Sequence, residues 1–204
     1  MQCPQLTISE EDNEVIGKGD SYFDKNFARK AGVPERFLEA TFENTQNCCT
    51  QRVLDFTQFS RGVLILNGSN GTGKSRTACA AINYRIANGI APGMYISCNY
   101  QVCPLIRSSR SFRADKNEMQ VLTEYYTTPF LILDEVGKGD DSVISKMFVT
   151  CVLAARYDNN LPTLITTNLT NQELADFLGA DVTSRLHETA KVAVLDGKDL
   201  RQGN

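Results

Sequence analysis

Residues 68–75 of this 204-residue chain constrain its fold more than any other stretch, because they follow the pattern of a phosphate-binding loop. Two glycines flank four residues and are followed by Lys and Ser, in the run Gly68-Ser69-Asn70-Gly71-Thr72-Gly73-Lys74-Ser75. Glycines let several backbone N–H groups converge on one anion, and a helix that begins near Lys74 adds the positive end of its dipole. We therefore expect this loop and the next residue, Arg76, to bind the phosphates of a nucleotide. Lys74 would reach the β- and γ-phosphates, and the Ser75 hydroxyl would bind Mg²⁺.

The residues around the loop favour this interpretation. An apolar run at 62–66 predicts a buried strand directly before the loop, and an apolar run at 77–82 predicts a helix directly after it. The alternative is a glycine-rich turn that binds nothing. Such a turn does not require strand, loop and helix in this order.

A second stretch carries two acids at the end of another predicted strand. Four apolar residues, 130–133, lead into Asp134 and Glu135. Asp134 is expected to hold Mg²⁺, directly or through water, and Glu135 to polarise the water that attacks the γ-phosphate. Taken alone, the pair also fits a strand end followed by a solvated acidic loop. Its position about sixty residues after a phosphate loop favours the catalytic interpretation.

The predicted strands and helices alternate along the chain. Strands are expected at 62–66, 94–98, 130–134, 163–168 and 191–195, with helical segments between them. This alternation predicts an α/β fold with a mainly parallel sheet, helices on both faces and ligands beyond the carboxyl ends of the strands. Helices are expected at 99–110, with a break near Cys103-Pro104, at 115–126 and at 142–159. The 31–59 region either packs against the edge of the nucleotide domain or flanks the adenine.

Composition excludes several other classes of protein. The seven cysteines form no C-x-x-C pair and the chain has one histidine, so we expect no zinc site. Cys79, Cys98 and Cys151 lie in apolar patterns and are expected to be small core residues in a reducing compartment. No apolar run approaches the ~20 residues of a membrane helix, and no secretory signal is visible, so the expected location is cytoplasmic. The net charge of −3 means that any contact with nucleic acid must come from a local patch.

Several of these motifs together resemble the DnaC/IstB-type AAA+ ATPases. The resemblance spans about residues 31–201. It rests on the phosphate loop and on five further runs: Ala31-Gly32-Val33-Pro34-Glu35-Arg36-Phe37 with Ala40-Thr41-Phe42-Glu43, Leu131-Ile132-Leu133-Asp134-Glu135-Val136-Gly137, Thr166-Thr167-Asn168-Leu169, Thr183-Ser184-Arg185-Leu186, and Gly197 with Arg201.

This resemblance implies a fold and a set of roles. The fold would be a P-loop NTPase of the AAA+ type, with a five-stranded parallel sheet and a minimal or absent lid. Residues 1–30 would be an arm or short accessory helix, and 31–204 the ATPase domain. Asn168 resembles sensor 1, which helps position the attacking water. Arg185 resembles the arginine finger that reaches a neighbouring subunit's γ-phosphate, and Arg201 a sensor 2 arginine. The alternatives are a turn asparagine, a surface arginine capping a helix and a residue of a flexible tail.

An arginine finger used in trans implies subunits that associate head to tail, as rings or open filaments. The resemblance also implies single-stranded DNA binding. Four cations recur every three residues and would follow one side of a helix, with Phe112 among them to stack on a base: Arg107, Arg110, Arg113 and Lys116. The alternative is a solvated basic face.

The predicted function is Mg²⁺-dependent hydrolysis of ATP to ADP and phosphate by a helicase loader or accessory factor in DNA replication. The expected partners are single-stranded DNA, a replicative helicase and further copies of the chain, and no membrane. Three alternatives stay open: an IstB-like ATPase that assists a transposase, a nucleotide-gated binding module with negligible turnover, and a small-molecule phosphotransferase.

Overall fold

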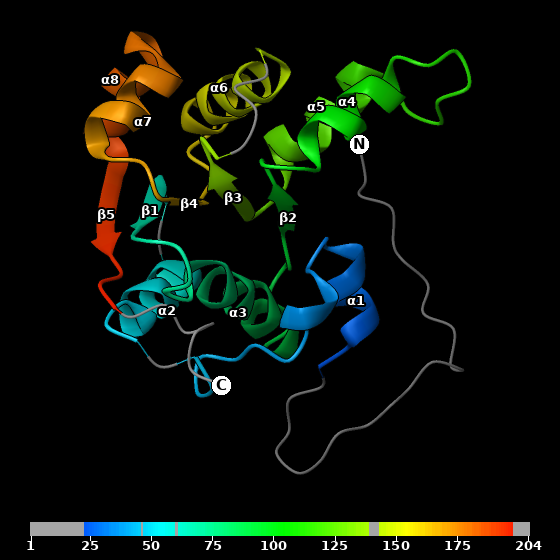
Figure 1. Cartoon of the computed structure of the whole chain (residues 1–204). Helices are drawn as coiled ribbons and strands as arrows, with labels where there is room; N and C mark the ends of the chain where they lie inside the picture. The colour runs from blue at the N-terminus through cyan, green and yellow to red at the C-terminus, as the bar shows by residue number, and fades with distance from the viewer. Residues whose placement is uncertain (1–22, 46, 60, 139–142, 198–204) are drawn as a thin grey trace.

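The computed structural model describes residues 23–45, 47–59, 61–138 and 143–197 (Figure 1). At its centre lies a sheet of five parallel strands in the order β2-β3-β4-β1-β5. Their bounds are β1 Val63–Asn67, β2 Met94–Ser97, β3 Leu131–Val136, β4 Thr163–Thr167 and β5 Ala190–Val194. This arrangement confirms the predicted parallel five-stranded sheet of a P-loop AAA+ domain.

Helices cover both faces of the sheet (Figure 1). One face is covered by α1 Lys25–Lys30, the short 3₁₀ turn η1 Glu35–Phe37, α2 Thr50–Phe59 and α3 Lys74–Ala87. The other is covered by α4 Val102–Ser109, α5 Glu118–Thr127, α6 Val143–Asp158, α7 Asn171–Leu178 and α8 Ala180–Thr189. The α1 helix packs into the core through the fully buried Ala28. Most of the arm expected at 1–30 lies outside the described residues.

The apolar strands form continuous runs in the sequence because each strand is buried on both sides. Side chains alternate across a strand, so Leu64 and Leu66 pack with α2 and α3, whereas Val63 and Ile65 pack toward α6, α7 and α8. A fully buried aliphatic side chain contributes roughly 1.5–3 kcal/mol. Two separate cores therefore fix the sheet, and with it the position of every strand end.

The helix boundaries follow local sequence signals, with some differences from the prediction. Thr170 and Glu173 form the predicted capping box of α7, and α3 ends before Gly89 as expected. The predicted break in α4 is wrong: the helix is continuous across Pro104, because the first turn of a helix needs no proline N–H. The helix ends at Ser109, with Arg110 as its C-cap.

One side chain expected to be buried lies at the surface. Cys151 is exposed on α6, unlike Cys79 and Cys98. It lies on the outer side of its helix. An apolar pattern that continues around a helix does not say which of its members face the sheet. Within the described ranges, no helix is long and apolar enough to cross a membrane.

Candidate active site

The phosphate loop connects the carboxyl end of β1 to the start of α3, as its sequence predicts. Gly73 is the residue that precedes the helix, and its φ of 94° lies in the left-handed region that favours glycine. The Lys74 ammonium donates to the carbonyl oxygens of Gly68 and Ser69, both at 2.7 Å. The Thr72 hydroxyl donates to the Ser69 carbonyl at 3.0 Å. These bonds hold the loop in its curled form.

Asp134 lies at the carboxyl end of β3 and is 1% exposed. Its carboxylate accepts hydrogen bonds from the Tyr95 hydroxyl at 2.6 Å and from the Thr166 hydroxyl at 2.5 Å. Burial raises the pKa of Asp134, and the Thr166, Tyr95 and Ser75 hydroxyls oppose that rise without cancelling it. Ser75 is therefore close enough to Asp134 to affect its pKa, so the two expected Mg²⁺ ligands lie near each other. Two oxygen ligands, one of them a carboxylate, fit the chemistry that Mg²⁺ prefers.

Glu135 follows with an unusual backbone. Its φ is 59°, and the register of β3 against β4 shifts between Leu133 and Val136. Its N–H donates to the Thr166 hydroxyl oxygen at 2.9 Å, so one buried hydroxyl connects the Asp134 side chain to the Glu135 main chain. Non-glycine residues in this region are strained and occur often at functional sites. The strained backbone turns the Glu135 side chain into the cavity beside the phosphate loop.

An ion pair holds the Glu135 carboxylate. Its Oε1 lies 2.6 Å from the Lys138 ammonium, and its Oε2 accepts longer bonds of 3.4 Å from Ser97 and Asn99. Burial raises the pKa of Glu135, but Lys138, Asn99 and Ser97 together outweigh burial. The pKa of Glu135 is therefore below its usual range. The carboxylate is ionised at neutral pH, as a base that accepts a proton must be.

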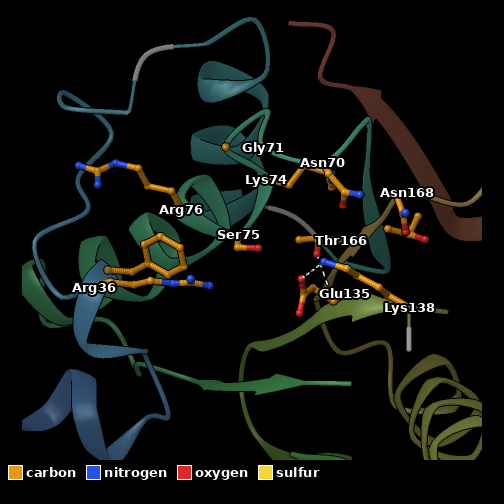
Figure 2. Close-up of a pocket in the computed structure, with 13 residues that line it drawn as sticks. Arg36, Asn70, Gly71, Lys74, Ser75, Arg76, Glu135, Lys138, Thr166 and Asn168 are labelled. Atoms are coloured by element: carbon orange, nitrogen blue, oxygen red, sulfur yellow. Dashed lines mark hydrogen bonds and ion pairs between the residues drawn. The ribbon is translucent and has the colours of Figure 1, made fainter. Parts of the chain in front are cut away.

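The phosphate loop and Glu135 line one cavity of about 310 Å³ (Figure 2). Arg36 and Arg76 lie toward one end, Glu135, Lys138 and Asn168 lie toward the other, and Gly71, Lys74 and Ser75 lie between. Arg36 also stacks on the Phe37 ring, 4.6 Å from its centre, and Arg76 donates to Asn44 and Thr45. The structure thus brings together the loop, Glu135 and Asn168.

Arg185 lies elsewhere. It is on α8 and packs on the end of α6, with its guanidinium 3.0 Å from the Asp158 carboxylate and 5.3 Å from the centre of the Tyr157 ring. It is not among the described residues that line the cavity of its own chain. Arg201 lies outside the described residues.

The four cations of the predicted DNA stripe do not share one helix. Arg107 is on α4, Arg110 caps it, and Arg113 and Lys116 lie in the connection to α5. Arg110 pairs with Glu118 at 2.6 Å, and Lys116 pairs with Glu124. The helical arrangement assumed for the stripe is therefore wrong. Phe112 is fully exposed, and a shallow cavity beside it is lined by Ser108, Ser111, Arg113 and Lys116 among others.

Sequence reasoning missed several residues of the site. Lys138 and Thr166 carried no assigned role, although both fall within or next to the motifs quoted above. Arg36 and Phe37 belong to the run that resembles the family, and they line the cavity from the 31–59 region. A lysine three residues after an acid, across a glycine turn, is the signal that could have identified Lys138. Thr166 could not be identified, because its partners come from another strand.

The sequence matches a known protein family and several of its relatives. A sequence model of the family described as IstB-like ATP binding protein matches residues 36–201. A replicative helicase loader DnaC from Buchnera aphidicola subsp. Schizaphis graminum is 23% identical over 166 residues, which cover 77% of this chain and 67% of that protein. The replicative helicase loader DnaC of Escherichia coli K12 is 26% identical over 123 residues, covering 60% of this chain. The chain thus spans about two thirds of the first relative, and the match covers 49% of the second.

Solved structures show the same fold. The crystal structure of a DnaC helicase loader superposes with a TM-score of 0.63 and 22% identity, over 80% of this chain and 100% of that one. A replication initiator DnaA, solved with AMPPCP and single-stranded DNA, gives a TM-score of 0.64 and 16% identity, over 81% of this chain and 51% of that one. At these identities the likeness is one of fold.

Proposed function

The chain belongs to the DnaC/IstB-like AAA+ family of ATP-binding proteins, and from that premise we propose that it is a Mg²⁺-dependent ATPase. It acts as a helicase loader or accessory factor in DNA replication and binds single-stranded DNA. One observation carries the proposal: the phosphate loop, an ionised Glu135 and Asn168 line a single cavity. A loop that only bound phosphate would not need a carboxylate held at the far end of the cavity.

The residues divide the chemistry between them. The loop amides and Lys74 bind the phosphates, and Ser75 and Asp134 would hold Mg²⁺, which supplies charge neutralisation for the transferring phosphoryl group. Glu135 orients the attacking water and accepts its proton, and Asn168 can donate to the γ-phosphate while accepting from that water. The half-buried cavity strengthens each of these electrostatic contacts.

The other end of the cavity is suited to the base of the nucleotide. Phe37 and Arg36 supply an apolar ring and a planar cation, and both groups stack on aromatic rings. Asn83, on α3, donates to the carbonyl oxygens of Phe37, Leu38 and Ala40. The helix that begins at the phosphate loop therefore also fixes the segment that contacts the base.

The first experiment measures ATP binding and ATP turnover separately in three chains. The wild-type chain should bind and hydrolyse ATP. Lys74→Ala should lose binding, because it removes the cation of the loop. Glu135→Gln should bind ATP and lose at least about 100-fold in turnover, the usual contribution of a positioned base. Turnover of Glu135→Gln at the wild-type rate would contradict the assignment of Glu135.

A nucleotide-gated module with negligible turnover is the second candidate. The ion pair with Lys138 favours it, because a carboxylate bound to an ammonium at 2.6 Å is a weakened base. If wild-type ATP binding is tight and turnover stays at the level of Glu135→Gln even with single-stranded DNA and a partner, this candidate replaces the ATPase.

The partner decides between replication and transposition. The family name points to IstB-like proteins, and the relatives described above are helicase loaders. Purified chain with ATP should form a complex with a replicative helicase from the same source, seen by size-exclusion chromatography. A complex with a transposase alone would assign the chain to transposition instead.

A further inference from the structure

Lys138 is held at the cavity by a tight turn. Its N–H donates to the Glu135 carbonyl at 3.2 Å, and Gly137, within the turn, has a φ of 76°. A Cβ atom on Gly137 would lie 2.2 Å from the Leu169 side chain, so the turn packs closely against the connection that follows Asn168. The Val136 carbonyl accepts a bond from the buried Thr167 hydroxyl at 2.8 Å. These contacts hold the turn in a conformation that places the Lys138 side chain against Glu135.

The Lys138 ammonium faces the cavity as well as Glu135 (Figure 2). The Lys138 side chain is 33% exposed and that of Glu135 is 20% exposed, so the pair is only partly screened by water. Lys74, the other lysine of the cavity, is bonded to the carbonyls of its own loop. The cavity therefore has lysine ammonium groups from two sides, one on the loop and one after β3.

The orientation of a nucleotide in the cavity decides which of its phosphates lies near Lys138. Arg36 and Arg76 are at the opposite end, and the loop, which binds the phosphates, lies between (Figure 2). A nucleotide with its base near Phe37 therefore directs its terminal phosphate toward Glu135, Asn168 and Lys138. We propose that Lys138 recognises the γ-phosphate and so lets the site distinguish ATP from ADP. The inference rests on the nucleotide site of the proposed function and deepens it.

The chemistry requires only a charge-assisted contact. A γ-phosphate brings negative charge to the end of the cavity where Glu135 already carries one, and Lys138 is the cation paired with that carboxylate. ADP ends one phosphate earlier and does not need the contact. Lys138 thus favours ATP selectively, and its turn ties that contact to the position of Glu135.

The test compares the affinity of the full chain for AMPPNP and for ADP, each with Mg²⁺, by isothermal titration calorimetry. Lys138→Gln should bind AMPPNP about tenfold more weakly, the effect of one charge-assisted hydrogen bond, and ADP within about twofold of wild type. Lys138→Arg should recover part of the loss. Lys146→Gln, which removes an exposed lysine from α6, should change neither affinity.

A second set of variants distinguishes two ways in which Lys138 could act: by contacting the γ-phosphate, or by neutralising the charge of Glu135. Without Lys138, the Glu135 carboxylate would itself repel the γ-phosphate, so the comparison is repeated in chains that carry Glu135→Gln. The tenfold loss should persist there if Lys138 contacts the phosphate. Its disappearance in that background, or equal losses for AMPPNP and ADP, would overturn the inference while leaving the nucleotide site intact. A wild-type chain that binds neither nucleotide would overturn the proposed function with it.

Discussion

At the scale of single residues, Thr166 connects the two acids of the site. Its hydroxyl donates to Asp134 and accepts from the Glu135 N–H, and the residue is fully buried. Replacement by Val keeps the shape and leaves two buried polar groups without this partner. We expect Thr166→Val to lower the free energy of unfolding by about 1–3 kcal/mol, measured by urea denaturation, and to lower ATP turnover at saturating Mg²⁺ by at least tenfold.

Thr163 provides the matched control. It is the first residue of β4, is equally buried, and its hydroxyl accepts from the Arg156 guanidinium at 2.8 Å and donates to the Leu161 carbonyl at 3.3 Å, away from the cavity. Thr163→Val should lose similar stability and keep most of its turnover. Equal turnover in the two variants would show that Thr166 supports the fold alone.

Sequence reasoning identified residues whose chemistry is local. The phosphate loop, Asp134 and Glu135 were predicted because each lies at a strand end in the printed sequence, and Asn168 was predicted from the family resemblance. Thr166 and Tyr95 were missed because their roles depend on neighbours brought close by the sheet, through the pairing of β3 with β2 and β4. Lys138 was missed although its partner is only three residues away. The ion pair of Arg110 with Glu118 was equally invisible, since its partners lie eight residues apart across a turn.

At the scale of elements, the turn after β3 depends on Gly137. A side chain there meets a left-handed backbone and the Leu169 side chain, which packs on the core beneath α7. Gly89, after α3, has a positive φ of 63°, and a Cβ added there would meet no atom within 4 Å. Gly89→Ala should therefore cost about 1 kcal/mol from the backbone alone. Gly137→Ala should cost about 1–3 kcal/mol more, from displaced packing.

Thermal unfolding of the two glycine variants checks this difference. Gly137→Ala should also weaken AMPPNP binding more than ADP binding, because the displaced turn carries Lys138. Equal unfolding temperatures in the two variants would mean that Leu169 moves aside without loss.

The last turn of α4 and its connection to α5 carry two classes of cation. Arg110 and Lys116 are paired with acids, whereas no ion pair involves Arg107 or Arg113 among the described residues. If the connection binds single-stranded DNA, Arg107→Gln and Arg113→Gln should each reduce the slope of log K against log salt by about 0.7. Arg110→Gln should reduce the slope less, because Glu118 competes for the cation. Fluorescence anisotropy with labelled oligonucleotide at several salt concentrations measures this, and identical slopes in all variants would remove the connection from the DNA site.

The end of α4 was predicted better than its start. The helix was expected at 99–110, and it runs from Val102 to Ser109 with Arg110 as its C-cap. The N-cap residue, Gln101, makes no side-chain capping bond, so the sequence carries no signal for the start of this helix. The capping box at Thr170 was predicted because its signal needs only four adjacent residues.

At the scale of the whole molecule, the role of Arg185 bears on whether one copy of the chain can hydrolyse ATP alone. Arg185 lies away from the cavity of its own chain, where it is paired with Asp158 and stacked on Tyr157. If it completes the site of a neighbouring copy, it must leave Asp158 to do so. Arg185→Ala should bind ATP normally and lose turnover, and wild-type turnover should rise more than linearly with protein concentration.

Asp158→Asn should lower the protein concentration at which turnover is half-maximal, because it removes the competing carboxylate. The pair is largely exposed, so the expected shift is only a few-fold. Turnover per chain that does not depend on concentration, in both wild type and Asp158→Asn, would exclude a finger used in trans.

The left-handed backbone conformation at Glu135 lowers the stability of the fold when the residue is glutamate. Asparagine adopts such a conformation with less strain than glutamate or glutamine, by up to about 1 kcal/mol. Glu135→Asn and Glu135→Gln should be equally inactive, and the asparagine variant should unfold at a higher urea concentration. Selection for stability alone would therefore favour asparagine over glutamate at this position. If Glu135 is the catalytic base, the chain retains a less stable strand end in exchange for reactivity.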